Sequence, residues 1–384
     1  MLTQYYHSRT DMQKIFNKNS LYVHIPFCLN KCLFCSFAVS VGQGHRADDY
    51  IAALEREAQI HRGARLNTVY LGGGTPTFLS TFQLKRLMRF LRGHFIFEPD
   101  CETTIEANPD DVNIEKARCL LDLGFNRVSM GAQTFDDRYL KFLGRAHDAA
   151  RAQAAFECLR KAGFGNINVD LMYGFPGQSQ EELNNDARCL ADLESEHVSV
   201  YTLTVEPNSR FYARQMKLDD EEKLARHYVL VTQALEAAGL RQYEISNFAR
   251  DGYESRHNSH YWTGGDYIGL GMGAHSHAAG RRFWNEDQLL PYLEKVNVAG
   301  SAVAGQEDLT LRQRLGERFV LGLRTNKGVD YAVVEDEIGC RLEANVLRQV
   351  TDLVEEGFLQ QEGTMVRATM KGRLVLDDIS ARLI

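Results

Sequence analysis

Apolar residues along this chain follow two alternating patterns from about residue 20 onwards. Short runs rich in β-branched and aromatic residues predict strands at 21–25, 68–71, 102–107, 127–132, 166–172 and 197–204. Amphipathic stretches between them predict helices at 48–61, 81–91, 113–123, 149–162 and 180–193. Alternating strands and helices give parallel strands joined by right-handed crossovers. Six such units predict an α/β fold built on a partial (β/α)6 barrel, with an open doubly wound sheet as the alternative.

The pattern changes in the last third of the chain. Residues 219–238 predict one long helix, and the stretch up to residue 300 is less regular. Two further helices, at 309–323 and 342–356, precede two short strands, at 358–361 and 365–368. This order predicts a small C-terminal α+β domain of winged-helix type. The expected parts are therefore an N-terminal extension, the barrel, a connecting region and a C-terminal domain, at 1–20, 21–240, 241–300 and 301–384.

Polar or glycine-rich segments follow every predicted strand of the barrel at its carboxyl end. In chain order they lie at 28–35, 72–77, 106–109, 131–134, 170–177 and 203–207. In parallel α/β proteins the active site gathers at the carboxyl ends of the strands. We therefore expect these segments to converge on one mouth.

The first of these segments holds three cysteines, Cys28, Cys32 and Cys35, spaced Cys-x3-Cys-x2-Cys. A [4Fe-4S] cluster that only carries electrons takes four protein ligands, so three leave one iron open to a small molecule. Disulfides are disfavoured, because the number is odd and the spacing tight. A structural zinc site completed by His24 or His45 is the alternative.

Other residues at the strand ends suit a small polar ligand. The tri-glycine turn at 72–74 lets polar groups of a ligand approach the backbone closely. Glu106 can hold an ammonium or a ribose hydroxyl, and Arg145 can pair with a carboxylate. Gln133 and Asp170 are partners for sugar hydroxyls. Each of these residues alone could have a purely structural role. Their shared position at the strand ends favours a role in ligand binding.

Bulk composition narrows the class of protein. The net charge of −7 over 384 residues gives no general reason to expect a nucleic-acid partner. No apolar stretch approaches 18 residues, so membrane insertion is not expected. The first residues lack the apolar core of a signal peptide, and eight cysteines without such a signal favour a reducing cytoplasm.

The segments described above resemble the radical S-adenosylmethionine (SAM) superfamily, and within it the oxygen-independent coproporphyrinogen III oxidase-like branch. The resemblance covers almost all of residues 20–384, and it implies a radical SAM barrel with a [4Fe-4S] cluster on the three cysteines. SAM would chelate the open iron, and one electron from the cluster would cleave it to methionine and a 5′-deoxyadenosyl radical. The implied SAM contacts are Tyr22, Phe34, Gly73, Gly74, Thr75, Glu106, Gln133, Arg145, Asp170 and Thr204.

Two features depart from the oxidase. The oxidase carries a fourth cysteine two residues after the third, where this chain has Phe37, and its longer N-terminal segment is largely missing here. Both features match the heme chaperones of this branch, the HemW type. That family carries His-Asn-x-x-Tyr-Trp, present here at 257–262. An imidazole can ligate heme iron, and aromatic faces can cover the macrocycle. The resemblance thus implies a heme contact at His257, with three rival ligands: His260, His275 and His277.

The resemblance implies a cytoplasmic heme chaperone, which binds heme and transfers it to an acceptor hemoprotein such as a membrane respiratory enzyme. Cluster and SAM would regulate dimerisation or transfer, or perform a radical step, and a homodimer is a further expectation. The alternative is an enzyme, either a SAM-dependent oxidative decarboxylase of coproporphyrinogen III or a radical enzyme acting on another tetrapyrrole.

Overall fold

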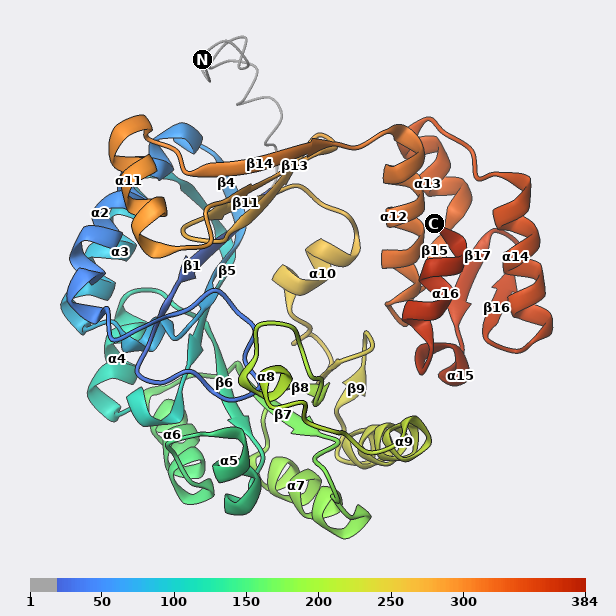
Figure 1. The fold of residues 1–384 in the computed structure, drawn as a ribbon, viewed down its shortest axis with the longest axis horizontal. Coiled ribbons are helices and arrows are strands. Elements are labelled where there is room, and N and C mark those ends of the chain that lie inside the picture. The colour runs from blue at the N-terminus through green and yellow to red at the C-terminus, as the bar shows by residue number, and fades with distance from the viewer. Residues whose placement is uncertain (1–18) are drawn as a thin grey trace.

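The computed structural model describes residues 19–384 of the chain (Figure 1). Most of the predicted N-terminal extension, residues 1–18, lies outside the described residues. Among residues 19–384, no helix has the length and apolar character needed to cross a membrane.

The six predicted barrel strands are confirmed. They are β1 (Asn19–Ile25), β4 (Arg65–Gly73), β5 (Ile96–Ala107), β6 (Arg127–Gln133), β7 (Ile167–Tyr173) and β8 (His197–Thr202). All six run parallel, and each pairs with the next along the chain. A doubly wound sheet would reverse its strand order at a switch point. The consecutive order therefore favours the barrel-type arrangement over the doubly wound alternative.

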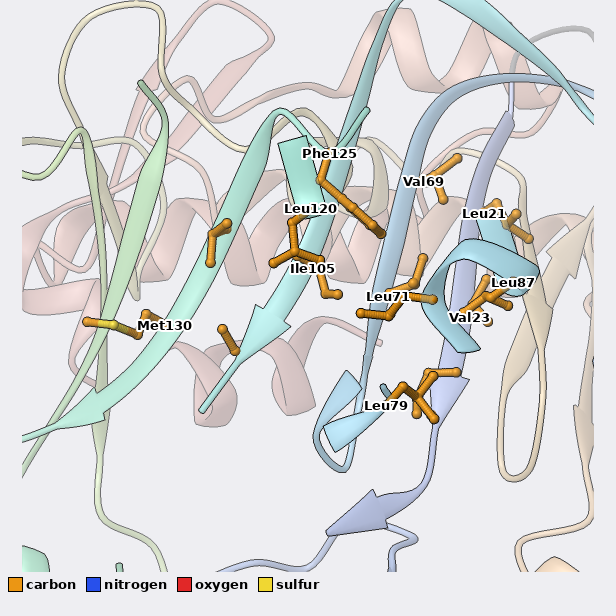
Figure 2. Close-up of a cluster of buried hydrophobic side chains, with 14 of the residues drawn as sticks. Leu21, Val23, Val69, Leu71, Leu79, Leu87, Ile105, Leu120, Phe125 and Met130 are labelled. Atoms are coloured by element: carbon orange, nitrogen blue, oxygen red, sulfur yellow. The ribbon is translucent and has the colours of Figure 1, made fainter. Parts of the chain in front are cut away.

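The predicted helices cover the outer face of this sheet (Figure 1). They are α2 (Ala47–Ala58), α3 (Thr81–His94), α4 (Ile114–Asp122), α6 (Ala149–Ala162) and α7 (Gln180–Leu193). Figure 2 shows Val23, Leu71 and Ile105 of the strands packed towards Leu87 and Leu120 of the helices. All five side chains are fully buried, and each contributes about 1.5–3 kcal/mol to stability.

The region at 241–300, predicted to connect the barrel and the C-terminal domain, supplies strands that pair with β8 and with β1. Two strands, β9 (Arg241–Gln242) and β10 (Asn247–Ala249), continue the sheet antiparallel beyond β8. Strand β11 (Tyr267–Leu270) pairs parallel with β1. The sheet then continues antiparallel through β12 (His275–Ala278), β13 (Arg281–Asn285) and β14 (Val303–Asp308), while α11 (Leu289–Ala299) packs against α2. Within residues 19–384, the sheet thus has 12 strands.

The remaining elements of the main unit surround the mouth of the barrel. The cysteine segment lies between β2 (Phe27–Cys28) and β3 (Ser40–Val41), which pair with each other. The other elements are α5 (Asp137–Leu143), α8 (Arg210–Ala213), α9 (Glu221–Ala237) and α10 (Arg256–Trp262). Helix α10 lies on the concave side of the sheet, between the strands and the C-terminal domain (Figure 1).

The C-terminal part has the winged-helix order predicted for it. Helix α12 (Leu311–Leu323), strand β15 (Val329–Asp330), helices α13 (Tyr331–Ile338) and α14 (Ala344–Glu355) precede the hairpin β16 (Leu359–Glu362) and β17 (Met365–Ala368). The three strands form a separate sheet, and the domain has its own apolar core. Two helices, α15 (Met370–Arg373) and α16 (Leu376–Leu383), complete it.

Candidate functional site

A cavity of about 1230 Å³ lies between the carboxyl ends of the barrel strands and the C-terminal domain. Residues of all six predicted strand-end segments line it, as expected for a single mouth. The predicted site residues in its wall are Cys28, Cys32, Phe34, Cys35, Gly73, Gly74, Thr75, Glu106, Gln133, Arg145, Asp170 and Thr204. Two predicted residues, Tyr22 and His257, are not part of the wall.

Main-chain contacts fix the cysteine loop against the barrel mouth. The Leu33 N–H donates to the Leu143 carbonyl at 2.9 Å, and the Leu33 carbonyl accepts from Phe211 at 2.9 Å. The Cys28 Sγ lies 3.5 Å from Thr75 Oγ1, and the Cys32 Sγ accepts from Arg145 Nη1 at 3.5 Å. The loop is therefore held by the parts of the chain that follow β4, β6 and β8.

The three thiols suit a cluster that takes each thiolate on a different iron. All three line one cavity, beside the positive charge of Arg145. Burial raises the pKa of the Cys28 thiol to about 11, and the neighbouring thiols add to this shift. Iron binding removes the thiol protons and supplies the missing positive charge. No three His, Cys, Asp or Glu side chains among residues 19–384 converge on a single metal ion.

His24, one of the two fourth ligands considered for the zinc alternative, is occupied elsewhere. Its Nδ1 lies 3.0 Å from the Tyr22 hydroxyl, and its Nε2 lies 2.8 Å from the Ala38 carbonyl oxygen. Both ring nitrogens therefore have partners away from the thiols. Tyr22 lies beneath the mouth, where its ring stacks on Tyr70 with 6.2 Å between the centroids.

The glycine run is packed too closely for any side chain. Gly73 has φ +110°, and a Cβ atom there would lie 2.5 Å from the His24 ring. A Cβ on Gly74 would lie 2.7 Å from the Pro26 carbonyl and 3.0 Å from the Cys28 Sγ. The Gly74 N–H donates to the Ile25 carbonyl at 2.9 Å. The sequence requires glycine here because the backbone of this turn touches the cysteine loop directly.

Glu106 is held in place at the end of β5. Its Oε2 accepts from the Gly73 N–H at 3.0 Å, and its Oε1 accepts from the Tyr70 hydroxyl at 2.9 Å. Burial raises the pKa of this carboxyl to about 7, and the nearby Asp170 adds to the shift while both hydrogen bonds oppose it. A ligand ammonium in the cavity would favour the charged carboxylate.

This shift predicts a pH dependence that depends on Glu106. A raised carboxyl pKa stabilises the fold below the unfolded value of 4.5, and that stabilisation disappears as the pH rises through about 7. Between pH 5 and 8, without SAM, the free energy of unfolding of the native chain is expected to fall by up to about 3 kcal/mol relative to that of Glu106→Gln. Urea unfolding of both chains measures the difference. An exposed control, Glu236→Gln, is expected to follow the native chain, and an unchanged difference across this range would contradict the prediction.

Arg145 and Gln133 line the mouth near the ends of β5 and β6. Arg145 Nη2 donates to Asn108 Oδ1 and to the Gly131 carbonyl, each at 2.8 Å, while its buried Nε has no partner among the described residues. Gln133 has φ +72°, where the β6–β7 register shifts. Such backbone strain gathers at ligand sites. A carboxylate in the cavity would give the Arg145 guanidinium a charged partner.

His257, the predicted heme contact, lies inside the barrel on α10. It is 2% exposed, and its ring stacks on Tyr70 with 5.0 Å between the centroids. Its Nδ1 lies 2.7 Å from the Thr68 hydroxyl, which donates its own hydrogen to Ser20. Nδ1 therefore carries the ring proton, and the Nε2 lone pair accepts from the Tyr261 hydroxyl at 2.9 Å. Burial lowers the pKa of His257 to about 3, so the ring is neutral.

The residues that hold α10 are absent from the sequence prediction. The Glu102 carboxylate accepts from the backbone N–H groups of Arg256 and His257, at 3.0 and 2.9 Å. The Ser255 hydroxyl caps the helix by accepting from the Asn258 N–H. This Ser-x-x-Asn start is a signal in the sequence for a helix at this position. Glu102 gives no such signal, since its partner is 154 positions away.

Comparison with known proteins adds to this geometry. Residues 22–190 match the radical SAM superfamily, and residues 309–375 match the HemN C-terminal domain. The heme chaperone HemW of Bacillus subtilis is 37% identical over 94% of this chain and 97% of its own length. That of Lactococcus lactis is 36% identical over 94% of this chain and 98% of its own length.

Among solved structures, coproporphyrinogen III oxidase (HemN) from Escherichia coli, described as a radical SAM enzyme, superposes with a TM-score of 0.86. It shares 28% identity, and the alignment covers 98% of this chain and 93% of the oxidase. Radical SAM membership implies a [4Fe-4S] cluster and SAM as cofactors, and the three cavity thiols, the glycine turn and Glu106 fit these groups. With full-length relatives at this level of identity, the chain belongs to the HemW family of heme chaperones within the radical SAM superfamily.

Proposed function

We propose that this chain binds heme and transfers it to an acceptor hemoprotein. The observation that carries the proposal is the identity of 37% with a heme chaperone over nearly the full length of both chains. The cavity gives physical support, because its volume of about 1230 Å³ exceeds the 300–1,000 Å³ of an ordinary small-molecule pocket. Such a volume has room for a second ligand beside SAM.

The cofactors would occupy the cysteine end of this cavity. Cys28, Cys32 and Cys35 would hold the [4Fe-4S] cluster, which supplies one-electron reduction of SAM when bound. Glu106 would hold the SAM ammonium, and Arg145 its carboxylate. The further SAM contacts that we propose are Tyr22, Phe34, Gly73, Gly74, Thr75, Gln133, Asp170 and Thr204.

His257 would ligate the heme iron through Nε2. That nitrogen now accepts from Tyr261, and the ring is buried, so heme binding would require α10 to move away from the barrel interior. Three rivals, His260, His275 and His277, lie nearer the surface on α10 and β12. His275 is the most exposed of them, and it stacks on Trp284.

The setting of the transfer is a further part of the proposal. A cytoplasmic chain could deliver heme to a membrane respiratory enzyme without entering the bilayer itself. A homodimer would allow the cluster state of one copy to influence heme release from the other.

Heme titration of the anaerobically reconstituted chain tests the proposal. A Soret shift that saturates, followed by transfer of the heme to an added apo-hemoprotein, is the expected result. No spectral change with the native chain would rule out the heme chaperone function.

The second candidate is oxidative decarboxylation of coproporphyrinogen III, favoured by the TM-score of 0.86 with the oxidase. Against it stands Phe37, which is 65% exposed at the position of the oxidase's fourth cysteine. An anaerobic assay with SAM and a reductant separates the two functions. Formation of protoporphyrinogen would favour the oxidase, whereas SAM cleavage alone fits both.

A further inference from the structure

The C-terminal domain contributes a cationic wall to the cavity, formed by Arg324, Lys371 and Arg373. Other cations of the lining, Lys31 and Arg145, lie at the cysteine end. The wall residues come from the end of α12 and from α15, and they reach the cavity because the two domains are docked. This wall was not evident from the sequence, since its residues are spread over about 50 positions.

The three cations of the wall keep unused donors. Arg373 Nη1 donates to Gln242 Oε1 at 2.7 Å, Arg324 Nε lies 3.2 Å from Glu244 Oε2, and Lys371 Nζ donates to the Glu356 carbonyl at 2.9 Å. Within residues 19–384, the other N–H groups of these side chains have no hydrogen-bond partner. Neither Arg373 nor Lys371 has a carboxylate partner there.

The two guanidinium groups are anchored two positions apart on one segment. Arg373 donates to the Gln242 side chain, and Arg324 pairs with Glu244. The Gln242 side chain also donates to the Tyr228 hydroxyl at 2.6 Å, and Tyr228 lines the same cavity. Neighbouring guanidinium forks with free donors are the usual recognition element for carboxylates.

Apolar surface adjoins these charges. Tyr201 and Leu374 line the same cavity and remain 43% and 38% exposed. Arg324 also lies over the Trp262 ring, 4.6 Å from its centroid, which places the wall beside the His-Asn-x-x-Tyr-Trp segment. The carboxylates of the wall, Asp377 and Asp378, begin α16, where the helix dipole favours negative charge.

We propose that Arg324, Lys371 and Arg373 bind the two propionate carboxylates of heme, with the apolar macrocycle against the adjoining cavity surface. The inference rests on the proposed function and specifies the ligand edge that the C-terminal domain recognises. A planar apolar ring with two carboxylates on one edge matches apolar surface flanked by three cations.

The test compares ferric heme with its dimethyl ester, which lacks both charges. Each is titrated into the native, cluster-loaded chain in the same detergent buffer, and the Soret band is followed. Heme is expected to bind at least about tenfold more tightly than the ester. Equal affinities would overturn the inference while leaving the proposed function intact. No Soret change with either compound would contradict the proposed function and this site together.

Variants then locate the preference. The double variant Arg373→Gln, Lys371→Gln, which keeps only the Glu244-paired Arg324, is expected to lose most of the preference for heme over the ester, with its ester affinity unchanged from native. The matched control, Arg348→Gln on the exposed face of α14, removes a charge outside the cavity and is expected to keep the full preference. If the double variant still prefers heme by tenfold, or if the control loses the preference, the propionate carboxylates bind at a site other than this wall.

Discussion

Replacing Cys32 with alanine is expected to abolish the cluster, so that iron falls from about four atoms per chain to background. Two remaining thiols would leave two cluster irons without protein ligands, and Arg145 would lose its contact with the Cys32 sulfur. Cys32 is a suitable choice, because its thiol accepts a hydrogen bond from that arginine and the residue belongs to none of the buried apolar clusters of residues 19–384. Iron and sulfide analysis after anaerobic reconstitution measures the loss.

The matched control is Cys340→Ala in the C-terminal domain, which is expected to keep the native iron content. EPR spectra with and without SAM add an independent readout, since SAM bound at an open iron changes the signal of the reduced cluster. Native protein that binds one zinc atom and no sulfide would contradict the cluster assignment.

Replacing His257 with alanine is expected to lower heme affinity at least about 100-fold, since a buried neutral imidazole supplies the iron ligand in our proposal. This change also removes the contacts with Thr68, Tyr70 and Tyr261 that hold α10. Loss of heme alone would therefore not distinguish a ligand from a structural residue.

Tyr261→Phe makes the distinction, because it acts in the opposite direction. The Tyr261 hydroxyl occupies the Nε2 lone pair, so its removal should free that nitrogen and raise heme affinity about threefold to tenfold. The Soret position and the ferric EPR spectrum should remain those of the native complex. Unchanged or weaker heme binding by Tyr261→Phe would exclude the exchange of tyrosine for iron at this nitrogen.

The sequence predicts the barrel well because its outer face is apolar and its helices have clear ends. Two helices, α6 and α7, occupy the predicted ranges without change. Strand β5 starts six residues earlier than predicted. The sequence does not reveal this start, because Glu98, Pro99 and Asp100 are residue types depleted in strands. Strand β11 escaped prediction because it has only four residues and pairs with β1, about 250 positions earlier in the chain. The strands β12 to β14 extend the edge that β11 creates, each pairing with the strand before it.

The residues of the candidate site likewise fall into those that the sequence predicts and those that it does not. Residues at strand ends, such as Glu106 and Arg145, could be placed together because parallel topology alone brings them to one mouth. The surroundings of His257 could not, since its aromatic helix packs on the polar inner face and shows no apolar period. Tyr70 shows what the sequence does not reveal. Its ring stacks on His257 and its hydroxyl donates to Glu106, but the sequence pattern indicates only that its strand is buried.

The pairing of β1 with β11 has a consequence for biosynthesis. Strand β1 is interior to the sheet, yet its partner on one side follows about 250 residues later in the chain. At ribosomal speeds of roughly 5–20 residues per second, the nascent chain waits on the order of 10–50 s before that edge can close. The cysteine loop directly follows β1, so its thiols emerge long before β11 can pair with the open edge of that strand. Iron–sulfur insertion is therefore expected as a post-translational event, performed on the released polypeptide.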